Sequence, residues 1–303
     1  MAKRQDPIPP SIDEIDISKI NNLEAAQKTD RTFKKIVEEK IPLRKKRKGT
    51  GKFNFKESEL VPLPSKGLLY ENVTDAEEIF KGYIKLFPMT LKEEEILSTP
   101  RFLKSGSATR MILENCIDSE IDAKDILLFD SNFLMFYLRQ ISYGDEYTFT
   151  LKCSNNICEQ KFEHTVNISE LKFEELPEST KEPLIIQLPK CGFTVETILP
   201  RLYHSEEIYM RNRSRKKNTD DEDRRILDNL VTTTISIKDI DGKEIPKRDW
   251  EDFYEAITGI DAAELREKTK FDTGVDKLEG LGCPYCGEDY SGTIPIGIEF
   301  FRF

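Results

Sequence analysis

The chain has 303 residues and a mass of 35.1 kDa, enough for two modest domains or for one domain with appendages. Hydrophobic residues make up 38% and charged residues 34%, a balance that excludes a fully disordered chain or a membrane protein and indicates a soluble globular one. The formal charge is −10, but residues 1–52 carry 14 basic and 8 acidic side chains, a net of +6, which leaves −16 for the rest. The first residues show neither a secretory nor a transit signal, so the cytoplasm is the expected compartment.

Residues 1–60 are predicted to form a flexible basic arm. Two weak helical patterns, at residues 18–26 and 33–41, precede a basic run at residues 44–48. A basic arm on an acidic body can dock on an acidic partner, on nucleic acid or on another copy of the body. The charge alone does not choose among these partners.

Residues 61–146 are predicted to form a mainly helical domain that includes one strand at residues 82–87. Thr90 and Glu93 have the spacing of a capping box, in which each side chain satisfies a backbone donor of the other residue, so a helix should begin there. Pro100 is expected to bound this helix.

Two more helices are expected in the same domain. The first, at residues 108–117, places Cys116 on its apolar face. The second, at residues 131–142, should be capped by Asp130 and end near Gly144. It is apolar nearly all round, which predicts a buried helix.

Residues 147–200 and 276–303 are predicted to form a small antiparallel β subdomain that resembles a zinc ribbon. A period of two indicates a hairpin at residues 147–166 with cysteines at its tip, and a second hairpin is expected at residues 184–199. The end of the chain, residues 293–303, is expected to be extended and aromatic.

The segment between these parts, residues 201–275, is predicted to be a helical insertion. Helices are expected within residues 202–235, as two helices separated by an exposed charged turn at 218–223, and at residues 250–257 and 262–270. The fold class is therefore α+β, with a mainly helical body.

Four of the six cysteines form two closely spaced pairs, Cys153 with Cys158 and Cys283 with Cys286. Both spacings fall in the range of zinc knuckles, and Gly287 permits the tight turn that points backbone amides at the sulfur atoms. Ligation by thiolates alone favours Zn²⁺ over hard cations. Because four cysteines leave no open coordination position, the predicted zinc site is structural, not catalytic.

Two other interpretations of these cysteines remain open. The pairs can be unrelated buried thiols, since free cysteine is among the most buried residue types, and this is the favoured interpretation for Cys116 and Cys191. Cys283-Pro284-Tyr285-Cys286 is also the dithiol sequence of glutaredoxins. A redox dithiol requires a helix N-terminus, whereas the residues that follow this motif have the pattern of a strand.

No catalytic motif stands out. Residues 49–52 lack the glycine and the hydroxyl residue that a phosphate-binding loop needs at residues 46 and 53. His164 and His204 have no nucleophile motif near them, and the acidic clusters have the pattern of a solvated surface. The basic runs at residues 44–48 and 211–217 lack interleaved aromatic residues and the body is acidic, so nucleic-acid binding by a zinc ribbon is kept only as an alternative.

Four stretches are informative as an ordered set. They are residues 63–70 (LPSKGLLY), 88–97 (PMTLKEEEIL), 138–144 (LRQISYG) leading to Cys153, and 283–287 (CPYCG) leading to 294–302 (IPIGIEFFR). In this order they resemble the baseplate protein family of T4-like contractile-tailed bacteriophages, which includes the baseplate hub assembly protein, and related tail assembly proteins of other myoviruses. The resemblance covers about residues 61–303.

The resemblance implies a non-enzymatic role in building the baseplate, as a hub component or as an assembly factor. The implied partners are hub or wedge proteins, with no catalytic residue, no small-molecule substrate and no membrane. The implied location is the host cytoplasm during assembly, and the tail baseplate of the virion if the protein stays in the particle. Of the last aromatic residues, Phe300 and Phe301 are expected in the core of the protein, while Phe303 is left open.

Overall fold

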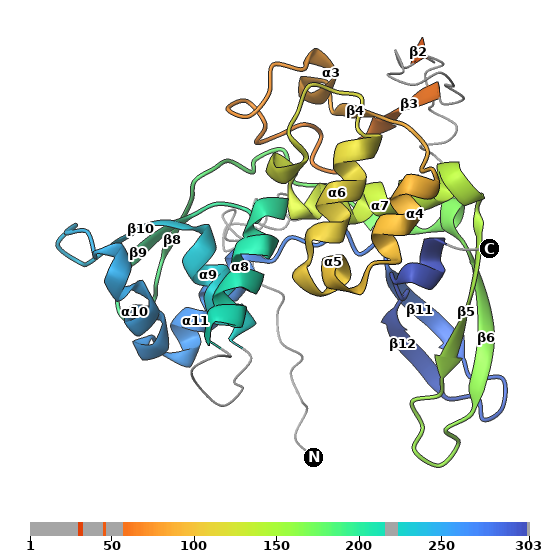
Figure 1. The fold of residues 1–303 in the computed structure, drawn as a ribbon. Helices are drawn as coiled ribbons and strands as arrows, with labels where there is room; N and C mark the ends of the chain where they lie inside the picture. Colours follow the sequence, from red (N-terminus) through yellow and green to blue (C-terminus); the bar gives the residue numbers. More distant parts are fainter. Residues whose placement is uncertain (1–29, 33–44, 47–56, 216–223, 302–303) are drawn as a thin grey trace, which may run out of the picture.

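A computed structural model describes residues 30–32, 45–46, 57–215 and 224–301. Helices and small antiparallel sheets alternate along these residues, which confirms the α+β class (Figure 1). Two separate apolar cores organise them, one built around α7 (Leu128–Tyr143) and one around β9 (Thr194–Thr197). None of the helices in the described part of the chain combines the length and the apolar character needed to cross a bilayer.

The elements have the following bounds. The helices are α3 (Glu77–Phe80), α4 (Leu91–Leu97), α5 (Pro100–Ser105), α6 (Ser107–Cys116), α7, α8 (Leu202–Arg215), α9 (Arg225–Thr233), α10 (Trp250–Ala256) and α11 (Gly259–Thr269), with short 3-10 helices η2 (Ala123–Asp125), η3 (Ile168–Glu170), η4 (Lys247–Asp249) and η5 (Ile298–Phe301). The strands are β1 (Asp30–Thr32), β2 (Lys45–Lys46), β3 (Glu57–Pro62), β4 (Tyr83–Leu86), β5 (Glu146–Lys152), β6 (Lys161–Asn167), β7 (Lys172–Glu174), β8 (Leu184–Gln187), β9, β10 (Thr234–Lys238), β11 (Lys277–Gly282) and β12 (Asp289–Thr293).

The first core begins with the pair β3–β4, in which Val61 lies opposite Ile84 and both side chains are fully buried. The capping box is confirmed at the start of α4, where the Glu93 carboxylate accepts hydrogen bonds from the Thr90 N–H at 2.7 Å and the Thr90 hydroxyl at 2.6 Å. Pro100 lies in the first turn of α5, a helix that the sequence analysis did not predict. Proline suits this position because the first turn of a helix has no use for its missing N–H.

The predicted cap at Asp130 is wrong. Helix α7 begins at Leu128, so Asp130 lies inside its first turn and its carboxylate is fully buried. It accepts hydrogen bonds from the Ser65 N–H at 2.9 Å and from the Tyr70 hydroxyl at 2.7 Å. The carboxylate therefore anchors the loop after β3 instead of capping its own helix. The predicted burial of this helix is confirmed, since its side chains from Phe133 to Leu138 are buried on every face.

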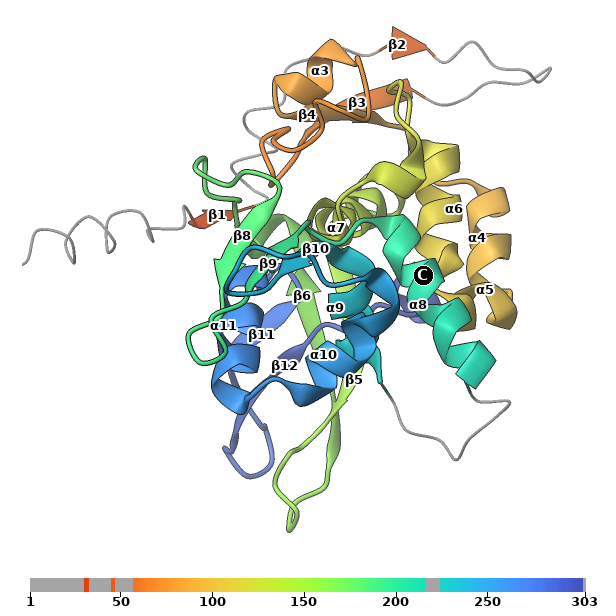
Figure 2. The same ribbon diagram turned by 90° about the vertical axis from the view of Figure 1, so that its left-hand side faces the viewer.

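The hairpin β5–β6 forms with the predicted alternation. Tyr147, Phe149 and Leu151 are buried on one face, while the residues between them are exposed. The hairpin β11–β12, which carries Cys283 and Cys286 in its turn, lies beside β5–β6 (Figures 1 and 2). Residues of both hairpins belong to the first core.

The extended C-terminus is a second correction. Strand β12 ends at Thr293 and the chain then turns into η5. Phe300 and Phe301 are nevertheless buried, at 0% and 1% exposure, which confirms their expected place in the core. Phe303 lies outside the described residues.

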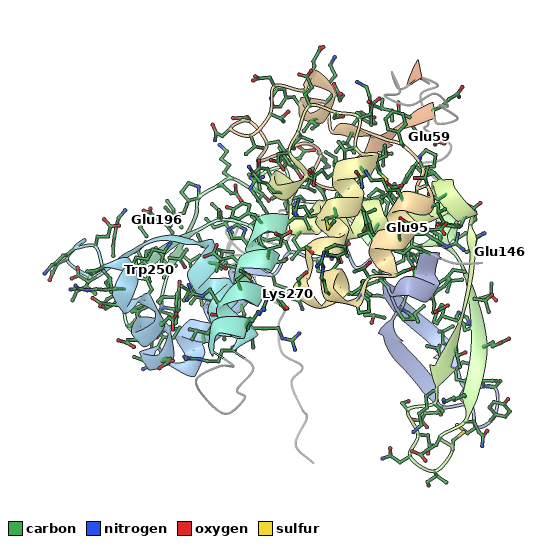
Figure 3. All side chains as sticks on the ribbon, in the orientation of Figure 1. Glu59, Glu95, Glu146, Glu196, Trp250 and Lys270 are labelled. Atoms are coloured by element: carbon green, nitrogen blue, oxygen red, sulfur yellow. The ribbon has the colours of Figure 1, made fainter. Side chains whose placement is uncertain are left out.

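The second core lies under a three-stranded antiparallel sheet in the order β10–β9–β8. Ile186, Val195 and Ile237 occupy neighbouring positions on its inner face and pack with Trp250 of α10 and Leu265 of α11. Figure 3 shows Trp250 within this part of the molecule, away from the two other hairpins.

The sheet composition differs from the expectation. The predicted β subdomain places the hairpin at residues 184–199 with the cysteine-bearing hairpin, but this hairpin pairs instead with β10, a strand that the sequence pattern does not predict. The described parts of residues 202–235 accordingly form helices α8 and α9 and then the start of strand β10. The turn at residues 218–223 lies outside the described residues.

Only short pieces of residues 1–60 are described. Strand β1 pairs with β7, and β2, within the basic run, pairs with β3. Ser58 of β3 is already buried, so the body begins before residue 61. The helical patterns at residues 18–26 and 33–41 and most of the proposed arm lie outside the described residues.

Candidate metal centre

The four cysteines predicted as ligands meet at one end of the two hairpins. The Cys153 and Cys286 sulfur atoms are 3.6 Å apart, those of Cys158 and Cys283 are 3.9 Å apart, and all four lie within 4.8 Å of one another. Cys153 and Cys158 flank the loop between β5 and β6, while Cys283 and Cys286 lie in the turn between β11 and β12. The structure thus joins two pairs that are 125 residues apart in sequence.

These separations suit a tetrahedral ion. With a Zn–S bond of about 2.3 Å, neighbouring sulfur atoms of a tetrahedral zinc site are about 3.8 Å apart. The separations between Cys153 and Cys286 and between Cys158 and Cys283 already have this value within a few tenths of an ångström. Four thiol ligands are the donor set of structural zinc sites, so the residues present fit Zn²⁺.

The backbone of the first loop is arranged around its cysteines. The Cys153 N–H donates to the Gln160 carbonyl at 2.9 Å and closes the loop, and the Asn155 N–H points at the Cys153 sulfur at 3.4 Å. Glu159 adopts a φ of 47°, in the left-handed region. Such N–H···S contacts stabilise a thiolate.

The second loop has the same construction with a tighter turn. The Cys283 N–H donates to the Glu288 carbonyl, and the Gly287 N–H donates back to the Cys283 carbonyl, both at 2.8 Å. Gly287 has a φ of 74°, which a glycine adopts without steric cost and which explains its position directly after the pair. The two loops also touch through the Asn155 side-chain amide and the Glu288 carboxylate, 3.4 Å apart.

The electrostatics of Cys283 favour its thiolate form. Desolvation opposes ionisation, but the backbone N–H groups of Tyr285 and Cys286 and the thiols of Cys153 and Cys286 outweigh it and lower the pKa of Cys283 to about 7. A thiolate is the form that binds a metal ion. Backbone N–H groups favour the thiolates of Cys153 and Cys286, but desolvation and contacts with neighbouring thiols raise the pKa values of both, so Cys283 is the member of the cluster that is shifted toward the thiolate before an ion arrives.

The other two cysteines lie apart from this cluster. Cys116 is fully buried in the first core, as its helical position predicts, and Cys191 lies at the tip of the β8–β9 hairpin, half-buried against the second core. His164 lies in β6 beside the ring of Phe149, and His204 lies in the first turn of α8.

His204 does not have the surroundings of a general base. It is buried, its Nδ1 accepts the Arg201 N–H at 2.9 Å, and desolvation lowers its pKa to about 4. Nδ1, the nitrogen that would take up a proton, is thus already occupied by a hydrogen bond at the start of α8. This agrees with a satisfied structural histidine.

A buried polar network, missed by the sequence analysis, lies where the chain crosses between the two cores. The Arg201 guanidinium donates to the carbonyls of Asp125 and Leu69, each at 2.7 Å, and pairs with the Glu182 carboxylate at 3.2 Å. Tyr70, whose hydroxyl donates to Asp130, is buried in the same region, and burial raises its pKa well above the ordinary value. No local pattern marks these residues, because their partners come from distant parts of the chain.

The family model described as T4 bacteriophage base plate protein matches residues 70–302, a stretch that includes all four clustered cysteines. The chain belongs to this family. No curated protein and no solved structure matches the chain. Membership confirms the resemblance seen in the sequence and supports a structural role in the phage tail baseplate.

Proposed function

We propose that the chain is a non-enzymatic component or assembly factor of the baseplate hub, which acts through contacts with hub or wedge proteins and is stabilised by a structural four-cysteine zinc site. The observation that carries the proposal is the cysteine cluster within a member of the baseplate family. Zinc bound at this site would hold together the ends of the hairpins β5–β6 and β11–β12 in a zinc-ribbon-like unit.

The geometry favours a clamp over a catalytic centre. Zn²⁺ bound by Cys153, Cys158, Cys283 and Cys286 would have four protein ligands and no position for a substrate or an activated water. The energy of binding would instead add to the stability of the fold, because the ligands come from two separate hairpins.

The redox alternative lacks its structural context. Cys283 and Cys286 lie in a turn between two strands, whereas a thioredoxin-like dithiol lies at the N-terminus of a helix whose dipole stabilises the thiolate. The sulfur atoms also have two further cysteines within reach, which suits a shared ion better than a two-cysteine disulfide.

The nucleic-acid alternative gains no support from the basic run that begins at Arg211. The Arg211 guanidinium pairs with the carboxylates of Asp228 and Glu251 and so connects α8 with α9 and α10. It therefore has a structural role between helices. Lys216 and Lys217 lie outside the described residues.

The test compares wild type with Cys283→Ser and with the matched control Cys191→Ser, each purified as the tagged full chain from cells producing the phage. Wild type and the control should carry one zinc per chain by elemental mass spectrometry, and Cys283→Ser should carry none. Hydrogen exchange of the β5–β6 backbone should speed up only in Cys283→Ser, since metal binding and folding are coupled. Baseplate proteins should copurify with wild type.

Quantitative mass spectrometry of purified particles and of the lysate completes the experiment. Stoichiometric copies in the particle identify a baseplate component, while abundance confined to the lysate, with baseplate proteins bound, identifies an assembly factor. A fully folded wild type without zinc contradicts the metal site. Absence of any association with baseplate proteins contradicts the baseplate role.

A further inference from the structure

Two apolar side chains are exposed in the loops that hold the cysteines. Ile157, next to Cys158, is 95% exposed, and Tyr285, between Cys283 and Cys286, is 64% exposed. Single exposed apolar residues are common on protein surfaces. These two, however, come from different hairpins and are brought to the same end by four sulfur atoms within 4.8 Å of one another.

The fold of the loops does not require either side chain. Asn155 holds the first loop, since its side-chain oxygen accepts the Ile157 N–H at 2.8 Å whatever side chain residue 157 carries. Ile157 and Tyr285 both lie outside the two apolar cores of the described residues. Turns of this kind ordinarily carry polar residues, so an exposed isoleucine and an exposed tyrosine at the same end of the molecule are candidates for contact with a partner.

The position of this end leaves it accessible. Strand β5 begins at Glu146, beside the helical body, and runs away from it, as Figure 3 shows. Figures 1 and 2 show both hairpins projecting from the helices with their loops farthest out. A partner can therefore reach the loops without meeting either core.

The charge of the loops indicates the partner's chemistry. Residues 152–161 and 282–289 contain two lysines, Lys152 and Lys161, against the three carboxylates of Glu159, Glu288 and Asp289, a net of −1. Four thiolates around one Zn²⁺ add −2. The complementary surface is basic, with an apolar pocket for the two side chains.

We propose that the end of the two hairpins, centred on Ile157 and Tyr285, docks onto a basic protein surface with an apolar pocket. The proposal rests on the proposed function, because part of the negative charge belongs to the metal site and the partner is a baseplate protein. Nucleic acid and anionic lipid carry the wrong charge for this surface.

The experiment places the photocrosslinking residue benzoylphenylalanine at position 157 of the full chain in cells producing the phage. A matched probe replaces Ile240, which is 74% exposed in the part of the molecule that contains the second core. Crosslinks from position 157 should concentrate on one baseplate protein and map to a peptide rich in lysine and arginine, while the probe at 240 should not reach that peptide. The crosslink should weaken as salt rises.

A second pair of variants carries the probe at position 285. Adding Ile157→Ser to this probe should lower the yield of the same crosslink about tenfold, since a buried isoleucine side chain is lost from the interface. Because Ile157 is exposed, zinc content and melting temperature should not change, so a lost crosslink reports binding and not folding.

The outcomes separate this proposal from the proposed function. If wild type binds zinc and baseplate proteins copurify, but the probe at 157 marks an acidic peptide, nucleic acid, lipid, or the same proteins as the probe at 240, the docking proposal alone is wrong. An unchanged yield with Ile157→Ser also overturns it. If zinc or the baseplate association is missing in wild type, the proposed function fails first.

Discussion

Asp130 shows how a single buried residue links parts of the first core. Its carboxylate is fully buried and joins α7 to the loop after β3 through Ser65 and Tyr70. Burial raises its pKa from 3.8 to about 6, although the hydrogen bonds from Ser65 and Tyr70 and the charge of Arg201 act in the opposite direction. The folded protein therefore holds this proton more tightly than the unfolded chain does.

The sign of the resulting pH dependence follows directly. The contribution of Asp130 to stability is fully present below pH 4 and is lost as the pH rises through about 6. Asp130→Asn should remove this dependence, so that wild type loses on the order of 3 kcal/mol relative to the variant between pH 4 and pH 7. Urea unfolding at both pH values measures the difference. Asp252→Asn, on the exposed side of α10, is the control, and a gap between wild type and Asp130→Asn that is equal at both pH values would contradict the prediction.

At the scale of elements, the short helix η5 attaches the cysteine-bearing hairpins to the helical body. The ring of Phe300 lies 4.9 Å, between ring centroids, from each of Phe136 in α7, Tyr147 in β5 and Phe301. One fully buried side chain thus contacts a helix and a hairpin at once. The position of the cysteine cluster relative to the helices depends on this contact.

Phe300→Ala should lower the free energy of unfolding by about 3–5 kcal/mol, because it removes a buried ring and leaves a cavity. Phe80→Ala makes the same change at a side chain that is 46% exposed, and should cost less than about 1 kcal/mol. Denaturant titration of the three proteins measures both values. Equal losses in the two variants would show that the ring contacts of Phe300 do not hold these elements together.

At the scale of the whole molecule, the connection between the two cores passes through Arg201. Its guanidinium binds the carbonyls of Leu69 and Asp125, in the first core region, and the carboxylate of Glu182, just before β8. Glu182 in turn accepts the Leu199 N–H at 2.7 Å. The chain segments that enter and leave the β8–β9 hairpin are therefore held to the first core by this largely buried ion pair, together with the backbone hydrogen bond from the Leu128 N–H to the Pro200 carbonyl.

Arg201→Met should destabilise the protein by about 3 kcal/mol, since it leaves the largely buried Glu182 carboxylate without its counter-charge and two backbone carbonyls without their donor. Hydrogen exchange should show a loss of protection that is larger in residues 184–199 and 225–269 than in residues 57–176. Lys238→Met breaks the partly exposed pair with Glu196 and should cost at most about 1 kcal/mol. A uniform loss of protection across both cores would argue against a connecting role for Arg201.

The sequence by itself determined the features that depend on neighbouring residues or on residue chemistry. The capping box of Thr90 and Glu93 and the alternation from Tyr147 to Leu151 concern backbone groups a few residues apart, so their spacing was sufficient. The spacing of Cys153, Cys158, Cys283 and Cys286 singled out the metal candidates because few residue types bind Zn²⁺. The ordered motifs also indicated the family that the family model confirms.

Only the tertiary structure decided which distant segments meet. The hairpin at residues 184–199 has no local feature that directs it to β10 and away from β5–β6, because strand pairing depends on the burial of the whole sheet. Asp130 resembles a helix cap until Ser65 and Tyr70 are brought against it. The exposed side chains of Ile157 and Tyr285 likewise lie at the same end of the molecule only because two hairpins, far apart along the chain, end at the same cluster of sulfur atoms.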